Sequence, residues 1–171
     1  MKGNDKERYL EKILRNILGV EPYKIVSAVL IVLFFIKLPV NALTFHLIHV
    51  NIFHLISNLI ALVVIGKSWW RIILGYAITS VLFLFTSKDV VGFSAVIYFV
   101  WATYMWNIFK APFDAKIKTI AVVLFVMITS YFTPQISFYM HFAPFILGFL
   151  VSALIAIYRR VNNDIKAALN D

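Results

Sequence analysis

The segment that decides the fold is HLIHVNIFHLISNLIALVVIG, residues 46–66, an apolar run that begins with polar side chains. It is long enough to cross a bilayer as a helix, since about 20 residues span the hydrocarbon core. Its first half carries His46, His49, His54 and Asn58, and polar groups inside a spanning helix are costly. The run therefore predicts a membrane helix that also carries part of a functional site.

The rest of the chain is similarly apolar, with 62% hydrophobic residues, 14% charged residues and a mean hydropathy of +0.88. A soluble domain carries about a quarter charged residues, so this composition excludes an ordinary soluble protein. Six apolar runs predict six spanning helices, at 23–38, 46–66, 69–87, 92–109, 117–133 and 139–158. The chain has no cysteine, which excludes thiol catalysis, disulfides and thiolate metal sites.

The positive charge predicts how the chain is oriented in the membrane. When residues at the very ends of the runs are counted with the adjoining loops, fourteen of the sixteen lysines and arginines lie before or at the start of the first run or after the second, fourth and sixth runs. Only Lys37 and Lys88 fall on the opposite side. Basic residues concentrate on the cytoplasmic side, so we expect six spans with both termini in the cytoplasm. The basic residues form no patch interleaved with aromatic residues, which argues against a nucleic-acid partner.

The N-terminal segment predicts a helix that lies on the bilayer surface. Residues 6–18, KERYLEKILRNIL, place apolar side chains on one helical stripe and basic side chains largely off it. This pattern is typical of amphipathic helices on an anionic leaflet. The predicted domains are a cytoplasmic amphipathic segment at 1–22, a six-helix core at 23–160 and a cytoplasmic tail at 161–171.

Two more polar features accompany the histidine-rich run. Gly92-Phe93-Ser94-Ala95 opens the fourth run, with Tyr98 one helical turn beyond Ser94, and His141 lies near the start of the sixth run. The second, fourth and sixth runs all pass from outside to inside, so Asn58, Ser94 and His141 are predicted at similar depth in the outer half of the bilayer. A nucleophile, a base and hydrogen-bond donors are the parts that acyl transfer needs.

No acidic residue lies within the runs that carry these positions, so they permit a serine–histidine dyad rather than a triad. Taken singly, each feature has a plain structural explanation, since serines and histidines also join membrane helices by hydrogen bonds. For His46 that structural role is the favoured interpretation. For the whole set, the predicted convergence at one depth favours a catalytic site.

Taken together, these features resemble the signature of the rhomboid family of intramembrane serine proteases. Rhomboids carry a His-x4-His-x3-Asn pattern on the second helix, a Gly-x-Ser-Gly motif at the fourth and a histidine on the sixth. The chain has His49, His54 and Asn58, then Gly92-Phe93-Ser94-Ala95, then His141, in the same order. The resemblance covers all six predicted spans, and it implies an all-α, six-helix membrane bundle in a prokaryotic cell membrane.

The resemblance also implies a role for each matched residue. Ser94 would be the nucleophile and His141 the general base, while His54 and Asn58 would join the Ser94 backbone N–H in the oxyanion hole. Tyr98 would stack on the His141 ring. The implied activity is hydrolysis of a peptide bond in a transmembrane protein substrate near the outer membrane face, without a cofactor or a metal.

The remaining match, His49, would tie the loop after the first span to the second helix. Several departures from the family pattern accompany these matches. Ala95 replaces the second glycine of the serine motif, and only Lys37 to Thr44 is available for the first loop, which is long in rhomboids. Pro144 stands where rhomboids usually have glycine, and because proline suits the first turn of a helix, it predicts that the sixth helix begins close to His141.

Two other functions remain open. One is a catalytically inactive rhomboid-like protein that binds or escorts membrane helices, although such proteins usually lack the serine or the histidine that this chain has. The other is a transporter or structural bundle in which histidines relay protons. Acidic residues within spans or paired broken helices would favour that second function, and the sequence has neither feature.

Overall fold

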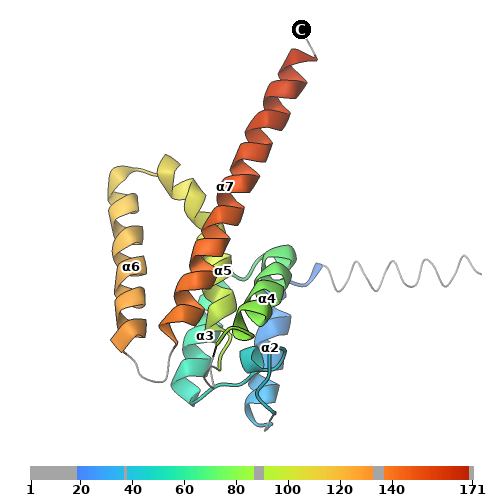
Figure 1. Ribbon diagram of the computed structural model, residues 1–171, viewed down its shortest axis with the longest axis vertical. Helices are drawn as coiled ribbons and strands as arrows, with labels where there is room; N and C mark the ends of the chain where they lie inside the picture. The colour runs from blue at the N-terminus through green and yellow to red at the C-terminus, as the bar shows by residue number, and fades with distance from the viewer. Residues whose placement is uncertain (1–18, 37, 87–90, 133–136, 170–171) are drawn as a thin grey trace, which may run out of the picture.

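The computed structural model describes residues 19–36, 38–86, 91–132 and 137–169, and these ranges contain helices and no strand (Figure 1). The α-helices are α2 (Pro22–Phe34), α3 (Ile52–Ile65), α4 (Trp69–Phe83), α5 (Ser94–Met105), α6 (Phe113–Phe132) and α7 (Phe138–Ala168). Two 3-10 helices, η1 (Phe45–Leu47) and η2 (Trp106–Lys110), join them. The all-α prediction is therefore confirmed for these ranges, while the amphipathic helix predicted at 6–18 lies outside the described residues.

Helix α5 lies at the centre of the bundle and packs most extensively against α7, and next against α4. Small residues on both neighbours allow this close approach. A Cβ at Gly148 of α7 would collide with the carbonyl oxygen of Phe99, and a Cβ at Gly75 of α4 would lie 2.9 Å from the Phe99 ring. This packing holds Ser94, the first residue of α5, at a fixed position relative to α7.

Helix α3 begins at Ile52 and not at the start of the predicted run at residue 46. Asn51 ends the preceding extended segment, and its side-chain oxygen accepts a hydrogen bond of 2.9 Å from the His54 N–H. Such a cap satisfies one of the N–H groups that a helix start leaves without a partner. His46 therefore lies in η1, and His49 lies between η1 and α3. Neither residue belongs to α3, although both were predicted to lie in the second spanning helix.

Helix α7 begins at Phe138 and continues beyond residue 158, into the predicted cytoplasmic tail (Figure 1). The helix begins three residues before His141, as predicted, but Pro144 is its seventh residue and so stands in the second turn, not the first. The proline supplies no N–H to the carbonyl of Met140, yet its side chain is fully buried, and the helix runs through it.

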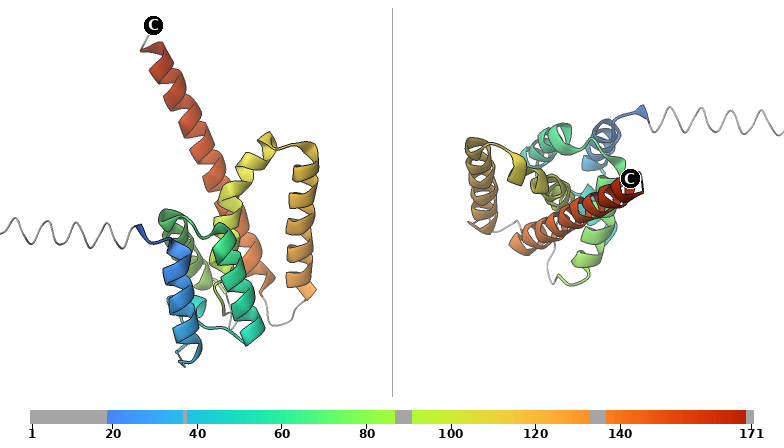
Figure 2. Two further views of the ribbon diagram at one scale, coloured as in Figure 1. Left: turned by 180° about the vertical axis from the view of Figure 1, so that it is seen from behind. Right: turned by 90° about the horizontal axis from the view of Figure 1, so that it is seen from above.

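Helix α6 stands to one side of the other helices (Figures 1 and 2). Its main contacts are with α7 and η2. The view from above in Figure 2 separates it from α2, α3 and α4. The candidate site residues lie elsewhere, on α3, at the start of α5 and in the first turn of α7.

One helix in the described ranges, Phe138–Ala167, is long and apolar enough to cross a membrane. The other apolar helices, Pro22–Phe34, Ile52–Ile65, Trp69–Phe83 and Ser94–Met105, are shorter, with 12 to 15 residues each. At 1.5 Å per residue they are roughly 18–22 Å long, against a hydrocarbon core of about 30 Å. Six spans therefore stay a prediction.

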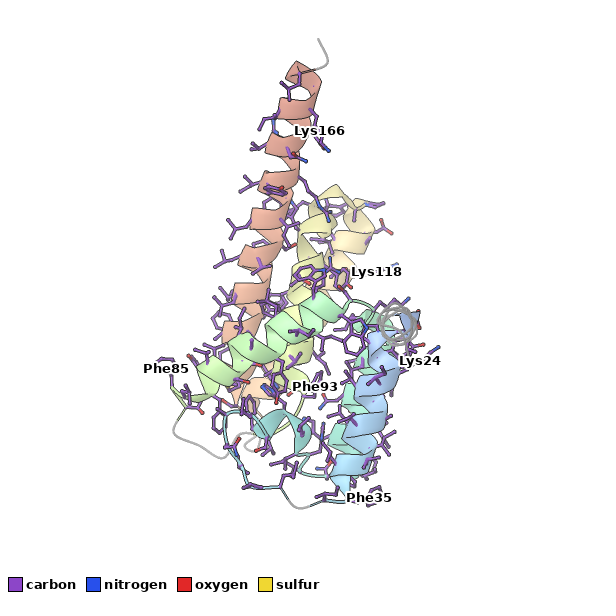
Figure 3. The ribbon with its side chains drawn as sticks, turned by 90° about the vertical axis from the view of Figure 1, so that its right-hand side faces the viewer. Lys24, Phe35, Phe85, Phe93, Lys118 and Lys166 are labelled. Atoms are coloured by element: carbon purple, nitrogen blue, oxygen red, sulfur yellow. The ribbon has the colours of Figure 1, made fainter. Side chains whose placement is uncertain are left out.

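The surface of the bundle exposes many large apolar side chains. Phe35, Phe53, Phe85 and Phe113 are 80%, 77%, 76% and 78% exposed. So many large apolar side chains on the surface favour contact with a membrane or a partner. Figure 3 shows Lys166 toward one end of the molecule and Phe35 at the other, with Lys24 and Phe85 at about the same height between them.

Candidate active site

Ser94 and His141 meet where the first residue of α5 faces the first turn of α7. The Ser94 hydroxyl oxygen lies 2.8 Å from Nε2 of His141, which is hydrogen-bond distance. The start of α7 is fixed by Ser137, whose hydroxyl accepts a hydrogen bond of 3.3 Å from the Met140 N–H. The two residues are 47 positions apart in the sequence, so the packing of α5 on α7 creates the pair.

Tyr98 lies one turn after Ser94 on α5 and stacks on the His141 ring. The two ring centroids are 4.3 Å apart and the ring planes differ by 22°. Both side chains are buried, at 6% and 5% exposure. A buried aromatic ring against the imidazole face restricts its rotation, so this contact helps to keep Nε2 directed at Ser94.

The chain reaches Ser94 through a glycine that no other residue could replace without strain. Gly92 has φ +121°, a conformation that L side chains rarely adopt. Its N–H donates to the carbonyl of Phe45 at 2.8 Å, which ties the serine segment to η1. A Cβ on Gly92 would collide with Cε1 of the His54 ring and lie 2.8 Å from its Nε2. The His54 ring therefore packs directly on the backbone two residues before Ser94.

Asn58 and His49 form a second hydrogen-bonded pair on the α3 side of the site. The Asn58 amide Nδ2 donates to Nε2 of His49 at 2.9 Å, and the rings of His49 and His54 meet edge to face with centroids 5.2 Å apart. Asn58 and His49 are buried. The structure thus joins the three residues of the His-x4-His-x3-Asn pattern, with His54 nearest to the serine segment and Asn58 bonded to His49.

The position of Ser94 at a helix start matters for its chemistry. The first N–H groups of an α-helix have no carbonyl partner within the helix, and they carry partial positive charge. The first intrahelical acceptor here is the Phe93 carbonyl, which receives the Ile97 N–H at 3.1 Å. The N–H of Ser94 therefore stands beside its own hydroxyl, where it could stabilise an oxyanion formed on attack.

Sequence reasoning did not find the partners of His46. Its Nε2 lies 3.1 Å from the Ser80 hydroxyl and 3.2 Å from the Thr79 hydroxyl, both on α4. All three side chains are buried. The only signal in the sequence is the adjacent Thr79-Ser80 pair inside an apolar run, and nothing in that pair indicates a partner more than 30 residues earlier.

Within the described residues, no group of three histidine, aspartate or glutamate side chains is placed to hold a metal ion. Comparison with known proteins adds no relative: no family model, no curated protein and no solved structure matches this chain. The site's chemistry must therefore be argued from its own geometry.

Proposed function

We propose that this chain is an intramembrane serine protease of the rhomboid type, which hydrolyses a peptide bond of a transmembrane protein near the outer membrane face. The observation that carries the proposal is the 2.8 Å approach of the Ser94 hydroxyl to Nε2 of His141. A serine hydroxyl is a weak nucleophile until a base accepts its proton, and a neutral imidazole at this distance is such a base.

The reaction would follow from this pair in two steps. Ser94 Oγ attacks the carbonyl carbon of the substrate while Nε2 of His141 takes the hydroxyl proton. The tetrahedral intermediate then collapses, the C–N bond breaks, and His141 returns the proton to the leaving amine. A water molecule hydrolyses the acyl-enzyme by the same path, with His141 again first the base and then the acid.

Donors for the oxyanion are available from two directions. The Ser94 N–H belongs to the open N-terminus of α5, and the His54 ring lies against Gly92, two residues before Ser94. Asn58 lies one turn beyond His54 on α3, and its amide has a second hydrogen besides the one given to His49. We assign all three groups to stabilising the oxyanion.

Several observations support a membrane setting with six spans and both termini in the cytoplasm. The bundle exposes many large apolar side chains, and in Figure 3 Lys118 and Lys166 lie away from the end that carries Phe35. The helices shorter than a bilayer fit a protein that thins or indents the membrane around it. Such an indentation would let water reach Ser94, which is only partly buried.

The test is cleavage of a single-pass transmembrane reporter, reconstituted with the purified protein in liposomes and followed by mass spectrometry of the products. Wild type should cut the reporter at one site within its outer half. Ser94→Ala and His141→Ala should each reduce cleavage below detection. The matched control is Ser57→Ala, because Ser57 is exposed and bonds only to the Phe53 carbonyl of its own helix.

Two outcomes would contradict the proposal. Cleavage by the Ser94→Ala protein would exclude Ser94 as the nucleophile. Wild-type protein that binds the reporter but does not cut it would instead favour the inactive, helix-binding alternative. Thermal melts of all four proteins separate lost chemistry from lost folding.

A further inference from the structure

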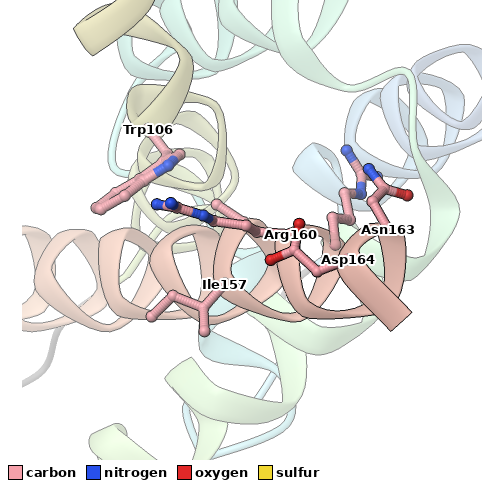
Figure 4. A pocket seen from close by; sticks show the side chains of 7 residues that line it. Trp106, Ile157, Arg160, Asn163 and Asp164 are labelled. Atoms are coloured by element: carbon pink, nitrogen blue, oxygen red, sulfur yellow. The ribbon is translucent and has the colours of Figure 1, made fainter. Parts of the chain in front are cut away.

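An open pocket of about 590 Å³ lies far from Ser94, near the C-terminal end of α7 (Figure 4). One wall is Trp106, the first residue of η2. The other wall is one stretch of α7, comprising Ala156, Ile157, Arg159, Arg160, Asn163 and Asp164. In Figure 4 the Arg160 side chain extends along the helix toward Trp106, so a cation and an indole ring face the same space.

The lining of this pocket changes from apolar to polar along the helix axis. Ala156 and Ile157 come first, and the charged and amide side chains follow within the next two turns. A phospholipid has the same order of chemistry, with acyl chains, then glycerol, then phosphate. An inorganic anion would use only the polar part, and it would leave the apolar part and the indole without a contact.

The cations of the pocket are available for a ligand. Within the described part of the chain, neither Arg159 nor Arg160 has an ion pair or a hydrogen bond. Arg71 differs, because its guanidinium carbon lies 3.7 Å from the centroid of the Tyr104 ring and is already used in packing. With Asp164 included, the pocket carries a formal net charge of +1, which suits a ligand with a single negative charge.

In the membrane orientation proposed above, the pocket lies at the depth of the lipid headgroups. Helix α7 starts at Phe138, and 20 residues at 1.5 Å each cross about 30 Å of hydrocarbon, which ends near Ile157. Arg159 and Arg160 then stand at the phosphate level of the cytoplasmic leaflet. Tryptophan is enriched at this interface because its ring is apolar and its N–H is a donor.

We propose that this pocket binds the headgroup of an anionic phospholipid of the cytoplasmic leaflet, with the phosphate between Arg159 and Arg160. The glycerol packs on the Trp106 indole, and the upper acyl chain follows Ala156 and Ile157. The inference rests on the membrane orientation proposed above and is independent of the Ser94–His141 chemistry. A bound lipid would add to the existing contact between η2 and α7, both of which also contact α6.

The experiment is native mass spectrometry of the full chain released from detergent micelles that contain defined lipids. The probes are phosphatidylglycerol, which is anionic, phosphatidylethanolamine, which has the same phosphate plus an ammonium, and inorganic phosphate alone. Wild type should retain one phosphatidylglycerol in preference to the other two. Because one basic residue near a membrane surface contributes a factor of about five in affinity, Arg160→Gln should lower retention about fivefold, and Arg159→Gln,Arg160→Gln about 25-fold.

Two matched variants make the test specific. Lys166→Gln removes the same charge from the same helix outside the pocket and should change retention less than twofold. Asp164→Asn removes the repulsive carboxylate and should raise retention of phosphatidylglycerol by a few-fold. Three results would each overturn the proposal. The first is an equal loss of retention in Arg160→Gln and Lys166→Gln, and the second is a preference for phosphatidylethanolamine that Asp164→Asn abolishes. The third is equal retention of free phosphate. Cleavage of the reporter is a separate readout, so loss of catalysis and loss of lipid binding are distinguishable.

Discussion

His141 and His46 each approach a serine hydroxyl through Nε2, at 2.8 Å from Ser94 and at 3.1 Å from Ser80. By distance alone, both are candidate pairs of base and nucleophile. The two serines differ in their helices, because Ser94 is the first residue of α5 and Ser80 lies in the last part of α4. An interior helical N–H donates to the carbonyl one turn earlier, so Ser80 has no free backbone donor for an oxyanion.

The surroundings of the two imidazoles differ as much as their serines do. His46 has no exposed surface and lies between the rings of Phe45 and Tyr76, with centroids 3.7 Å and 4.3 Å away. A substrate carbonyl would have to displace that aromatic packing to reach Ser80. In the other pair, His141 is also buried, but Ser94 is only partly buried. The comparison teaches that an imidazole–serine contact becomes a candidate for catalysis only with access and with free donors beside it.

The largest difference we expect between the two pairs is in covalent labelling. A fluorophosphonate needs an activated serine and an oxyanion site, so wild type should be labelled at Ser94 and nowhere else. Ser94→Ala should lose all labelling, whereas Ser80→Ala should keep it within about threefold of wild type. Peptide mapping of the labelled protein locates the adduct. An adduct on Ser80 would show that the pair of Ser80 and His46 is also reactive, which would contradict the difference between the two pairs.

The next largest effect concerns the donors that only the first pair has. Removing one oxyanion donor lowers turnover about 100- to 1000-fold, or roughly 3–4 kcal/mol. Asn58→Ala should therefore reduce kcat by that factor with little change in KM, because the bond belongs to the transition state. Reporter kinetics in liposomes measure both constants.

His49→Gln is the matched control for that prediction, because Asn58 donates to the His49 ring. If Asn58 acts only by anchoring His49, both variants should slow turnover equally. If Asn58 donates to the oxyanion, His49→Gln should be at least tenfold more active than Asn58→Ala. Equal kinetics in the two variants would assign Asn58 a purely structural role.

A smaller effect is expected from the ring that orients His141. Stacking of this kind contributes about 0.5–1.5 kcal/mol. Tyr98→Leu should therefore lower kcat roughly 2- to 10-fold by letting the imidazole rotate away from Ser94, while Tyr98→Phe keeps the ring and should stay closer to wild type. Turnover of the two variants at saturating reporter provides the comparison, and an unchanged rate in Tyr98→Leu would remove the orienting role.

Much of this arrangement could be predicted from the sequence, and the rest depends on contacts that no periodicity encodes. The apolar runs predict the helices and their order, and the common direction of the fourth and sixth runs predicts that Ser94 and His141 lie at similar depth. The start of α3 was predicted six residues early, because Leu47 and Ile48 are as apolar as the helix that follows. The overlooked signal was Asn51, whose side chain caps that helix.

The contact between His46 and α4 could not be predicted for a different reason. Its two hydroxyl partners are more than 30 residues away, and the contact depends on how η1 packs against α4. The same holds for the bond from Gly92 to the Phe45 carbonyl, which joins η1 to the serine segment through backbone atoms alone. Backbone–backbone contacts between distant segments leave no residue-type signature.

The smallest effect on activity, and the clearest effect on stability, should come from His46. Replacing it with phenylalanine keeps an aromatic ring but leaves the buried Ser80 hydroxyl without its partner, which costs about 1–3 kcal/mol. For a chain of this size that corresponds to a melting temperature lower by roughly 2–12 °C. Reporter turnover below the melting temperature should stay within about threefold of wild type, because the Phe45 carbonyl still holds Gly92 by its backbone. Thermal melts and reporter kinetics on the same His46→Phe preparation measure both quantities. A loss of activity as large as that of Asn58→Ala, without a lower melting temperature, would mean that His46 belongs to the chemistry and that the two pairs are not as different as their geometry indicates.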